Sequence, residues 1–216
     1  MNRFRAMFAT TTIVATLFVG LALNASAQTY PNKPVRLVIP FAPGGTTDIV
    51  GRFISDRLGR ELGQPVIIEN RAGGGGTVGA DYVAKAAPDG YVLSMATVST
   101  MATNPAMNPK MPYDATRDFV PVINLVNVPT FAEVGLKEAN NMAWYGLLAP
   151  AGTPRDVVEK IRAAAIRTLA DPDTRKRLIE SGAIIDGGSS EAFAQKIARE
   201  QALRRDIVKK QKLTLE

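Results

Sequence analysis

The stretch PFAPGGTTD, residues 40–48, joins a predicted strand to a predicted helix. Residues 35–39 read VRLVI, a β-branched run that is typical of a strand. Apolar residues recur at helical spacing from residue 49 until Gly63 ends the pattern. The prolines and glycines of the stretch exclude regular structure between these two elements. The sequence therefore predicts a strand that turns directly into a helix.

The same stretch has the features of an anion-binding loop. Gly44 and Gly45 carry no side chains, so backbone N–H groups are able to face a ligand there. We expect Thr46 or Thr47 to cap the helix, whose free N–H groups and positive dipole end point the same way. Such a site suits a carboxylate or a phosphate. The alternative is an ordinary strand-to-helix turn without a ligand.

Polar residues nearby are further candidates for this site. Asp48 stands in the first helical turn, where an acid either stabilises the helix end or contacts a ligand. Thr97 and Thr100 follow a predicted strand at its carboxyl end, where ligands of open α/β sheets bind, although hydroxyls there also cap nearby backbone. The candidate ligand-binding residues are Phe41, Ala42, Gly44, Gly45, Thr46, Asp48, Thr97 and Ser99.

Strand and helix patterns alternate through the first part of the chain. The predicted strands are 35–39, 65–69, 91–96 and 119–126, and the predicted helices between them are 49–62 and 77–87. Residues 97–118 are rich in Pro and Asn and predict a loop. Pro121 favours an edge position or a strand start for the last of these strands. The order predicts an α/β fold with a parallel or mixed sheet flanked by helices.

The last third of the chain predicts three helices. Their start signals stand at residues 153–154, 171–172 and 189–190, and the first pair places a Thr cap before a Pro in the first helical position. An apolar segment precedes them, in which we expect Trp144 and Tyr145 to be core residues.

Residues 1–27 have the pattern of a secretory signal peptide. Two arginines precede an uncharged apolar stretch at residues 6–23, and Ala25-Ser26-Ala27 is a small-x-small cleavage site. A membrane anchor is the alternative. We expect cleavage after Ala27 and a mature chain in the periplasm.

Composition excludes several classes of function. The 216 residues include neither Cys nor His, which removes Ser-His-Asp and Cys-His catalysis and the usual zinc sites. We therefore expect no catalytic residue, no metal and no cofactor. The formal charge of +6 falls to +4 without Arg3 and Arg5. Because the remaining cations are mixed with acids, the sequence does not predict nucleic-acid binding, although a modest positive field helps to gather anions.

Residues 74–79 read GGGTVG and match the dinucleotide-binding pattern G-x-G-x-x-G. The motif follows a predicted strand and opens a predicted helix, as a dinucleotide site requires. The next strand, residues 91–96, does not end in the acid that would hold a ribose. A tight turn, or a second backbone contact to a ligand, fits this motif better than a nucleotide site.

Motifs spread over nearly the whole mature chain resemble those of one family. They are Tyr30-Pro31-x-Lys33-Pro34-Val35-Arg36, the loop at 40–48, Glu69-Asn70-Arg71-x-Gly73, Pro88-Asp89-Gly90-Tyr91, Tyr113-Asp114, Gly146-Leu147-x-Ala149-Pro150 and Ala170-Asp171-Pro172. Together they resemble the Bug-type solute-binding proteins, the periplasmic receptors of tripartite tricarboxylate transporters.

The resemblance implies a two-lobed, periplasmic-binding-protein-like fold of type II. A small carboxylated solute is held in the cleft of such a protein. The loop from Phe41 to Asp48 then supplies contacts from the first lobe, and the loop from Thr97 to Thr100 lies beside it. The resemblance also implies that the partners are membrane subunits of the transporter, and that the protein is not an enzyme.

The chain departs from the family pattern after the strand predicted at 119–126. Such proteins carry a second lobe before the motif Val128-Pro129-Thr130, whereas the two flanks meet directly here. A domain-sized stretch of roughly 100 residues, with the opposing binding loop, is therefore expected to be missing. The expected organisation is a signal peptide at 1–27, a first-lobe segment at 28–128, and a return segment at 129–216 whose helices pack on the same lobe.

Two rival functions stay open from the sequence. An exported α/β nucleotide-binding protein or enzyme would use the Gly74–Gly79 loop. A non-functional remnant would follow from the loss of the second lobe. The solute retained after native purification distinguishes the three interpretations.

Overall fold

The computed structural model describes residues 29–129 and 143–212. The predicted signal peptide and its cleavage site lie outside these residues. The residues from Pro31 onward group into one unit around a single six-stranded sheet.

The sheet is mixed, and its strand order is β2-β1-β3-β5-β4-β6. Three strands are parallel, namely β1 (Val35–Ile39), β2 (Val66–Asn70) and β3 (Val92–Thr97). The antiparallel strands are β5 (Ala143–Pro150), β4 (Phe119–Val128) and β6 (Ile184–Ile185). Pro121 is the third residue of β4, and β6 pairs only with Val126 and Asn127, so Pro121 lies near the strand start expected for it. The predicted α/β fold class is confirmed.

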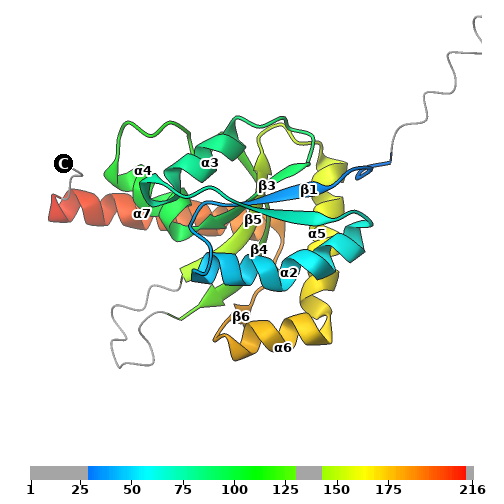
Figure 1. Cartoon of the computed structure of the whole chain (residues 1–216). Coiled ribbons are helices and arrows are strands. Elements are labelled where there is room, and N and C mark those ends of the chain that lie inside the picture. Colours follow the sequence, from blue (N-terminus) through cyan, green and yellow to red (C-terminus); the bar gives the residue numbers. More distant parts are fainter. Residues whose placement is uncertain (1–28, 130–142, 213–216) are drawn as a thin grey trace, which may run out of the picture. The chain divides into compact units, whose positions relative to one another are not determined.

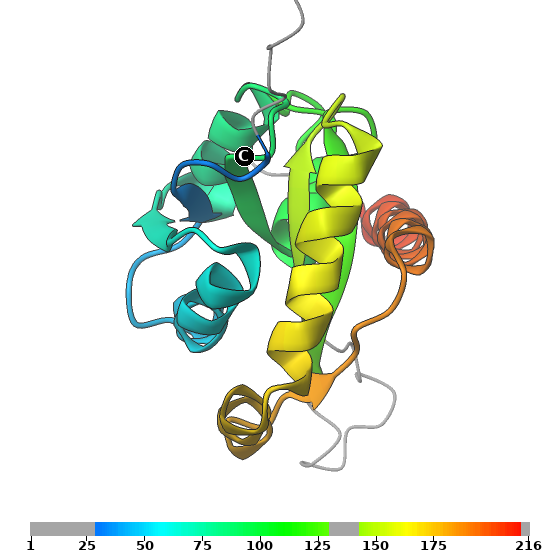
Figure 2. The same cartoon turned by 90° about the vertical axis from the view of Figure 1, so that its right-hand side faces the viewer.

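Helices cover both faces of the sheet. They are α2 (Thr46–Leu62), α3 (Thr77–Ala84), α5 (Arg155–Ala170), α6 (Pro172–Glu180) and α7 (Ser190–Gln211). Helices α2 and α3 lie on opposite sides of β1, as Figure 1 shows. Helix α5 packs beside α2, and α7 lies across β4 from α5 (Figure 2). Helix α3 is short, with 8 residues, and so spans about 12 Å.

The three helices predicted in the last third of the chain are confirmed, and two of their three predicted caps are correct. The Asp171 side chain accepts a hydrogen bond from the Thr174 N–H, and the Ser189 side chain accepts one from the Ala192 N–H, so both residues are N-caps. The expected Thr153 cap is wrong, because its hydroxyl donates to the Pro150 carbonyl and α5 begins after Pro154. Residues 97–118 also contain short helices that were not predicted: η3 (Ser99–Thr103) and α4 (Asn104–Met107).

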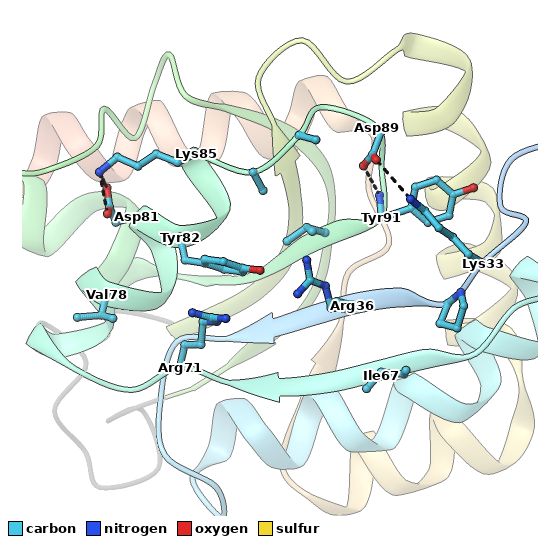
Figure 3. Close-up of a pocket in the computed structure, with 14 residues that line it drawn as sticks. Lys33, Arg36, Ile67, Arg71, Val78, Asp81, Tyr82, Lys85, Asp89 and Tyr91 are labelled. Atoms are coloured by element: carbon cyan, nitrogen blue, oxygen red, sulfur yellow. Dashed lines mark hydrogen bonds and ion pairs between the residues drawn. The ribbon is translucent and has the colours of Figure 1, made fainter.

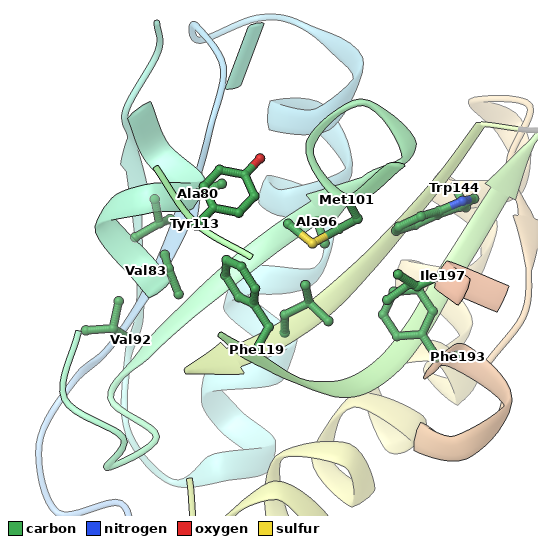
Figure 4. Packing of buried hydrophobic residues seen from close by; sticks show 12 residues of the cluster. Ala80, Val83, Val92, Ala96, Met101, Tyr113, Phe119, Trp144, Phe193 and Ile197 are labelled. Atoms are coloured by element: carbon green, nitrogen blue, oxygen red, sulfur yellow. The ribbon is translucent and has the colours of Figure 1, made fainter. Parts of the chain in front are cut away.

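One hydrophobic cluster lies on the face of the sheet that α3 and α7 cover (Figure 4). Trp144 and Phe193 meet edge to face with ring centroids 5.2 Å apart, which joins β5 to α7. Val38 of β1 and Val83 of α3 belong to the same cluster. This cluster fixes α3 over the carboxyl half of β1, and so fixes the loops at that end of the strands.

Candidate functional site

Three loops meet at one edge of the sheet. The carboxyl ends of parallel strands lie together, so β1, β2 and β3 deliver residues 41–48, 71–76 and 97–100 to the same place. We call these residues the loop cluster. A Cβ atom at Gly76 would lie only 2.7 Å from the Thr100 methyl group and 3.0 Å from the Phe41 ring. These three residues, one from each loop, are therefore in direct contact.

Asp48 holds the first loop in place. Its side chain is buried, with 3% of its surface exposed, and one oxygen accepts hydrogen bonds from the Gly44 N–H at 2.9 Å and from Arg52 Nε at 2.8 Å. The other oxygen accepts a bond from Asn70 Nδ2 at 2.9 Å, and the same amide nitrogen donates to the Phe41 carbonyl at 3.1 Å. We call Asp48, Arg52 and Asn70 the clamp, because together they fix the loop at both ends.

The clamp also determines the net charge beside the first loop. The hydrogen bond from Arg52, aided by those from Gly44 and Asn70, lowers the pKa of Asp48 from 3.8 to about 2. Asp48 is therefore ionised at neutral pH, and the Arg52 guanidinium balances its charge. The electrostatic preference of the loop then comes mainly from the amino-terminal end of α2, which favours anions.

The expected threonine caps of α2 are wrong. The N-cap is Gly45, and no side chain caps the helix there. The hydroxyls of Thr46 and Thr47 instead lie close to the Tyr145 hydroxyl, and burial of this phenol raises its pKa above the ordinary value. The first N–H groups of the helix, at Thr46, Thr47 and Asp48, thus have no acceptor within the helix.

The structure brings most of the candidate residues together. Those of the first loop are largely exposed, and those at the end of β3 are largely buried. Ala42, Gly44, Gly45 and Thr46 are exposed at the loop surface, and Phe41 is half-buried behind them. The Gly44 N–H donates to Asp48, and Gly44 has a φ of +87°, so this glycine shapes the loop. The backbone N–H groups left to bind a ligand are those of the first turn of α2.

The candidates after β3 face largely inward. Thr97 and Thr100 are buried, and each backbone N–H donates to the hydroxyl of the other residue, at 3.2 and 3.3 Å. Ser99 is half-exposed at the start of η3. Thr97 therefore braces the turn beside the first loop, and Ser99 offers the more accessible hydroxyl.

The glycine run at 74–76 forms a tight turn, η2 (Gly74–Gly76), against its neighbours. The Gly75 carbonyl accepts a hydrogen bond from Asn104 Nδ2 at 2.9 Å, which ties the turn to α4. This arrangement is the tight turn that the sequence favoured over a nucleotide site.

Sequence reasoning missed three residues of this site. Asn70 lies in the family motif at residues 69–73, but neither it nor Arg52 was a candidate, since their role depends on contact with Asp48 in the folded chain. Tyr145 was expected in the core together with Trp144. The alternation of side chains along a strand could have identified Tyr145. Trp144 is fully buried on one face of β5, so the next side chain, Tyr145, points to the other face.

The connection between β4 and β5 leaves the sheet at the same edge. Val128 pairs with Ala143, and Thr97 of β3 pairs with Tyr145 of β5, so both ends of this connection lie next to the loop cluster. Across residues 29–129 and 143–212, no three acidic side chains are grouped closely enough to hold a metal ion. No helix in those ranges combines the length and apolarity needed to cross a membrane.

Comparison with known proteins identifies the family. The family described as "Tripartite tricarboxylate transporter family receptor" matches residues 50–131 and 125–213. The chain belongs to this family. Its two matched segments overlap at residues 125–131, within β4 and immediately after it.

Individual relatives agree with the family assignment. Protein BugT of Bordetella pertussis is 41% identical over 130 residues, which cover 60% of this chain and 39% of that protein. A UPF0065 protein of Cupriavidus necator is 34% identical over 154 residues, which cover 70% of this chain and 42% of that protein. The chain thus spans about two fifths of the length of the curated relatives that it matches.

Solved structures share the fold. A periplasmic transporter superposes with a TM-score of 0.81 at 32% identity, over 87% of this chain and 100% of that one. MatC from Rhodopseudomonas palustris, solved with bound malate, gives a TM-score of 0.79 at 25% identity, over 83% of this chain and 100% of that one. The periplasmic binding protein BugD gives 0.81 at 22% identity, over 87% of this chain and 100% of that one.

Proposed function

We propose that this chain is a periplasmic solute-binding receptor reduced largely to one lobe, and that its loop cluster holds a carboxylate of a small organic acid. One observation carries this proposal. The clamp around the buried Asp48 carboxylate fixes the glycine loop at the amino-terminal end of α2, where backbone donors and the helix dipole favour an anion. A malate-bound relative with the same fold supports this class of solute.

The chemistry of binding follows from the loop. Because the candidate side chains at its surface are small, the solute reaches backbone N–H groups of the first turn, at Thr46 and Thr47, without steric hindrance. Phe41 forms a half-buried wall behind them, and Ser99 adds a hydroxyl from the neighbouring loop. No group here is arranged for bond cleavage, so the proposed role is binding and not catalysis.

The second lobe is proposed to be absent from this chain. The family model matches this chain in two separate segments that overlap at residues 125–131, which supports an internal deletion, and so does the pairing of Val128 with Ala143. A two-lobed receptor closes on its ligand, which excludes water and strengthens each polar contact. The loop cluster without a facing lobe stays open to water, where charged hydrogen bonds contribute less. We therefore expect dissociation constants in the millimolar range, about −4 kcal/mol.

Titration with malate tests this proposal. Chemical shift changes should be confined to the loop cluster and should give a millimolar dissociation constant. Insertion of the second lobe of a family member between Val126 and Thr130 should then restore tight binding. Micromolar binding by the chain as it stands, with a fall in radius of gyration when malate is added, would contradict the half-site.

Mass spectrometry of solute retained after native purification separates the rival functions. An organic acid supports the receptor, and a nucleotide supports use of the Gly74–Gly79 loop. A chain that retains nothing and shows no shift with millimolar malate supports the non-functional remnant.

We further propose that residues 1–27 are a signal peptide and that the mature receptor works with membrane subunits of a tripartite transporter. The arginines, apolar stretch and small-x-small site support export. N-terminal sequencing should find a chain that begins at Gln28 in the periplasmic fraction. An intact Met1 on cytoplasmic protein would contradict export.

A further inference from the structure

A cavity distinct from the loop cluster lies on the face of β1 and β2 beside α3. Its volume is about 700 Å³. Helix α3 ends at Ala84, so it covers Val38 but leaves the preceding part of the sheet face uncovered. Arg36 of β1 pairs with Ile67 of β2 and with Val92 of β3, and these three side chains form the floor. We call this cavity the groove (Figure 3).

Cations outnumber carboxylates along the groove. Four cations line it, and three carboxylates pair with them: Lys85 with Asp81, Lys33 with Asp89, and both Arg36 and Arg71 with Glu69. One positive charge is therefore left over. The cationic side chains are 37–65% exposed and the carboxylates 25–45%, so the positive charges lie closer to solvent.

Aromatic rings hold several of these cations in position. The Arg71 guanidinium lies 3.5 Å from the centre of the Tyr82 ring, and Lys33 lies 4.2 Å from the centre of the Tyr91 ring. Such contacts reduce the freedom of these long side chains and so keep their charges in place along the groove. Ile67 adds an apolar side chain with 50% of its surface exposed.

The arrangement of these charges indicates the shape of the binding partner. Figure 3 shows Lys85 at one end of the groove, Lys33 at the other, and Arg71 and Arg36 between them. A small solute needs donors that converge on one point, whereas these cations are spread along a line. Spread charges beside an exposed isoleucine fit an extended chain that carries several carboxylates and some apolar side chains.

We propose that the groove is the docking site for an extended, acidic segment of a partner protein. The surplus of exposed positive charge supplies the charge complementarity, and Ile67 and the two tyrosines supply the apolar contact. This interaction is independent of the solute proposed for the loop cluster, because the two regions share only Arg71. The side chain of Arg71 lines the groove, whereas its backbone N–H bonds to the Ile39 carbonyl at the loop cluster.

Fluorescence anisotropy with a fluorescein-labelled hexaglutamate peptide tests this docking site in the mature chain. Binding should weaken as salt is raised. Arg36→Glu should lower the affinity about fivefold or more, because it removes one attraction and adds a repulsion. The matched control is Arg175→Glu, an exposed arginine of α6 that changes the net charge equally and should lower the affinity less than about twofold. Arg36→Gln serves as the second variant if charge reversal beside Glu69 impairs folding.

Chemical shift mapping with the same peptide gives a second readout. Shifts of Arg36, Ile67 and Tyr82 support the groove. Shifts confined to Gly45 and Thr46 overturn the proposal, because the peptide would then occupy the loop cluster. Equal losses with Arg175→Glu, absence of binding, or complete displacement by free citrate at equal carboxylate concentration also overturn it, the last by showing a small-anion site.

Discussion

The loop cluster and the groove are built on the same three strands, and they present opposite chemistry. The loop cluster exposes small residues at Ala42, Gly44 and Gly45, so recognition there depends on backbone N–H groups and a helix end. The groove exposes long cationic side chains along a sheet face. The loop cluster therefore presents backbone donors that converge on one point, and the groove presents cationic side chains spread along its length.

This difference explains where the buried polar contacts lie. Backbone donors are aligned only when the loop itself is fixed, so the loop cluster requires the clamp, in which Asn70 and Arg52 bind the buried Asp48 carboxylate. Cationic side chains adjust individually, so the groove needs only ion pairs near its surface and ring contacts. We therefore expect substitutions at the loop cluster to have large, focused effects and those at the groove to have small, distributed ones.

Gly45→Val should have the largest effect on solute binding. Gly45 has an ordinary φ of −78°, and a Cβ atom there would meet only the Ala42 carbonyl at 3.8 Å, so the valine is accommodated without strain. Its side chain blocks approach to the backbone donors. The loss of one hydrogen bond to a charged ligand costs about 1.5–3 kcal/mol, or roughly tenfold to more than a hundredfold in affinity.

A malate titration followed by NMR measures this effect, and thermal unfolding provides the stability control. Gly45→Ala should give an intermediate loss of affinity, and the melting temperature of both variants should change little. Unchanged malate affinity in Gly45→Val would place the carboxylate site elsewhere.

Asp48→Asn should have the next largest effect, on stability. The folded pKa of Asp48, about 2, is lower than its ordinary value of 3.8, so the ionised carboxylate stabilises the fold by about 2 kcal/mol. That contribution is fully present above about pH 4 and is lost as the pH falls through 2. Denaturant unfolding at pH 7 should therefore show a loss of about 2 kcal/mol in the variant, and the difference from the wild type should shrink between pH 4 and pH 2.

Asp56→Asn is the matched control for this measurement. Asp56 also pairs with an arginine of α2, at 2.8 Å from Arg60, but its side chain is 78% exposed. Exposed pairs contribute roughly 0–1 kcal/mol, so this variant should unfold much like the wild type. Equal losses in both variants would mean that burial of the clamp adds nothing.

The sequence predicted those parts of the fold that depend on neighbouring residues. The turn from β1 into α2 and the caps at Asp171 and Ser189 require only residues within a few positions, and the structure confirms them. The predicted Thr46 or Thr47 cap failed because α2 already begins at Thr46, so Gly45 takes the N-cap position and both threonines lie inside the helix.

Residues that act through contacts distant in sequence were not predictable in this way. Asn70 meets Asp48 across 22 positions, and only the pairing of β1 with β2 brings them together. The groove depends on where α3 ends, three residues before the predicted end at residue 87. Element boundaries are set by packing as much as by local propensity, so a cavity that depends on a helix end is not visible in the sequence.

Arg71→Lys should have the smallest effect, and it tests whether ring contacts matter in the groove. Lysine keeps the positive charge but loses the planar guanidinium that lies on Tyr82 and donates to Glu69. An exposed cation–π contact contributes about 0.5–1 kcal/mol, so hexaglutamate affinity should fall roughly two- to fivefold, while malate binding stays unchanged. Arg117→Lys is the control, since Arg117 pairs with Asp114 on an exposed surface outside the groove. If Arg71→Lys binds the peptide as tightly as the wild type does, charge alone determines docking. If Arg71→Lys also weakens malate binding, the groove and the loop cluster are coupled through β2 and the loop that follows it.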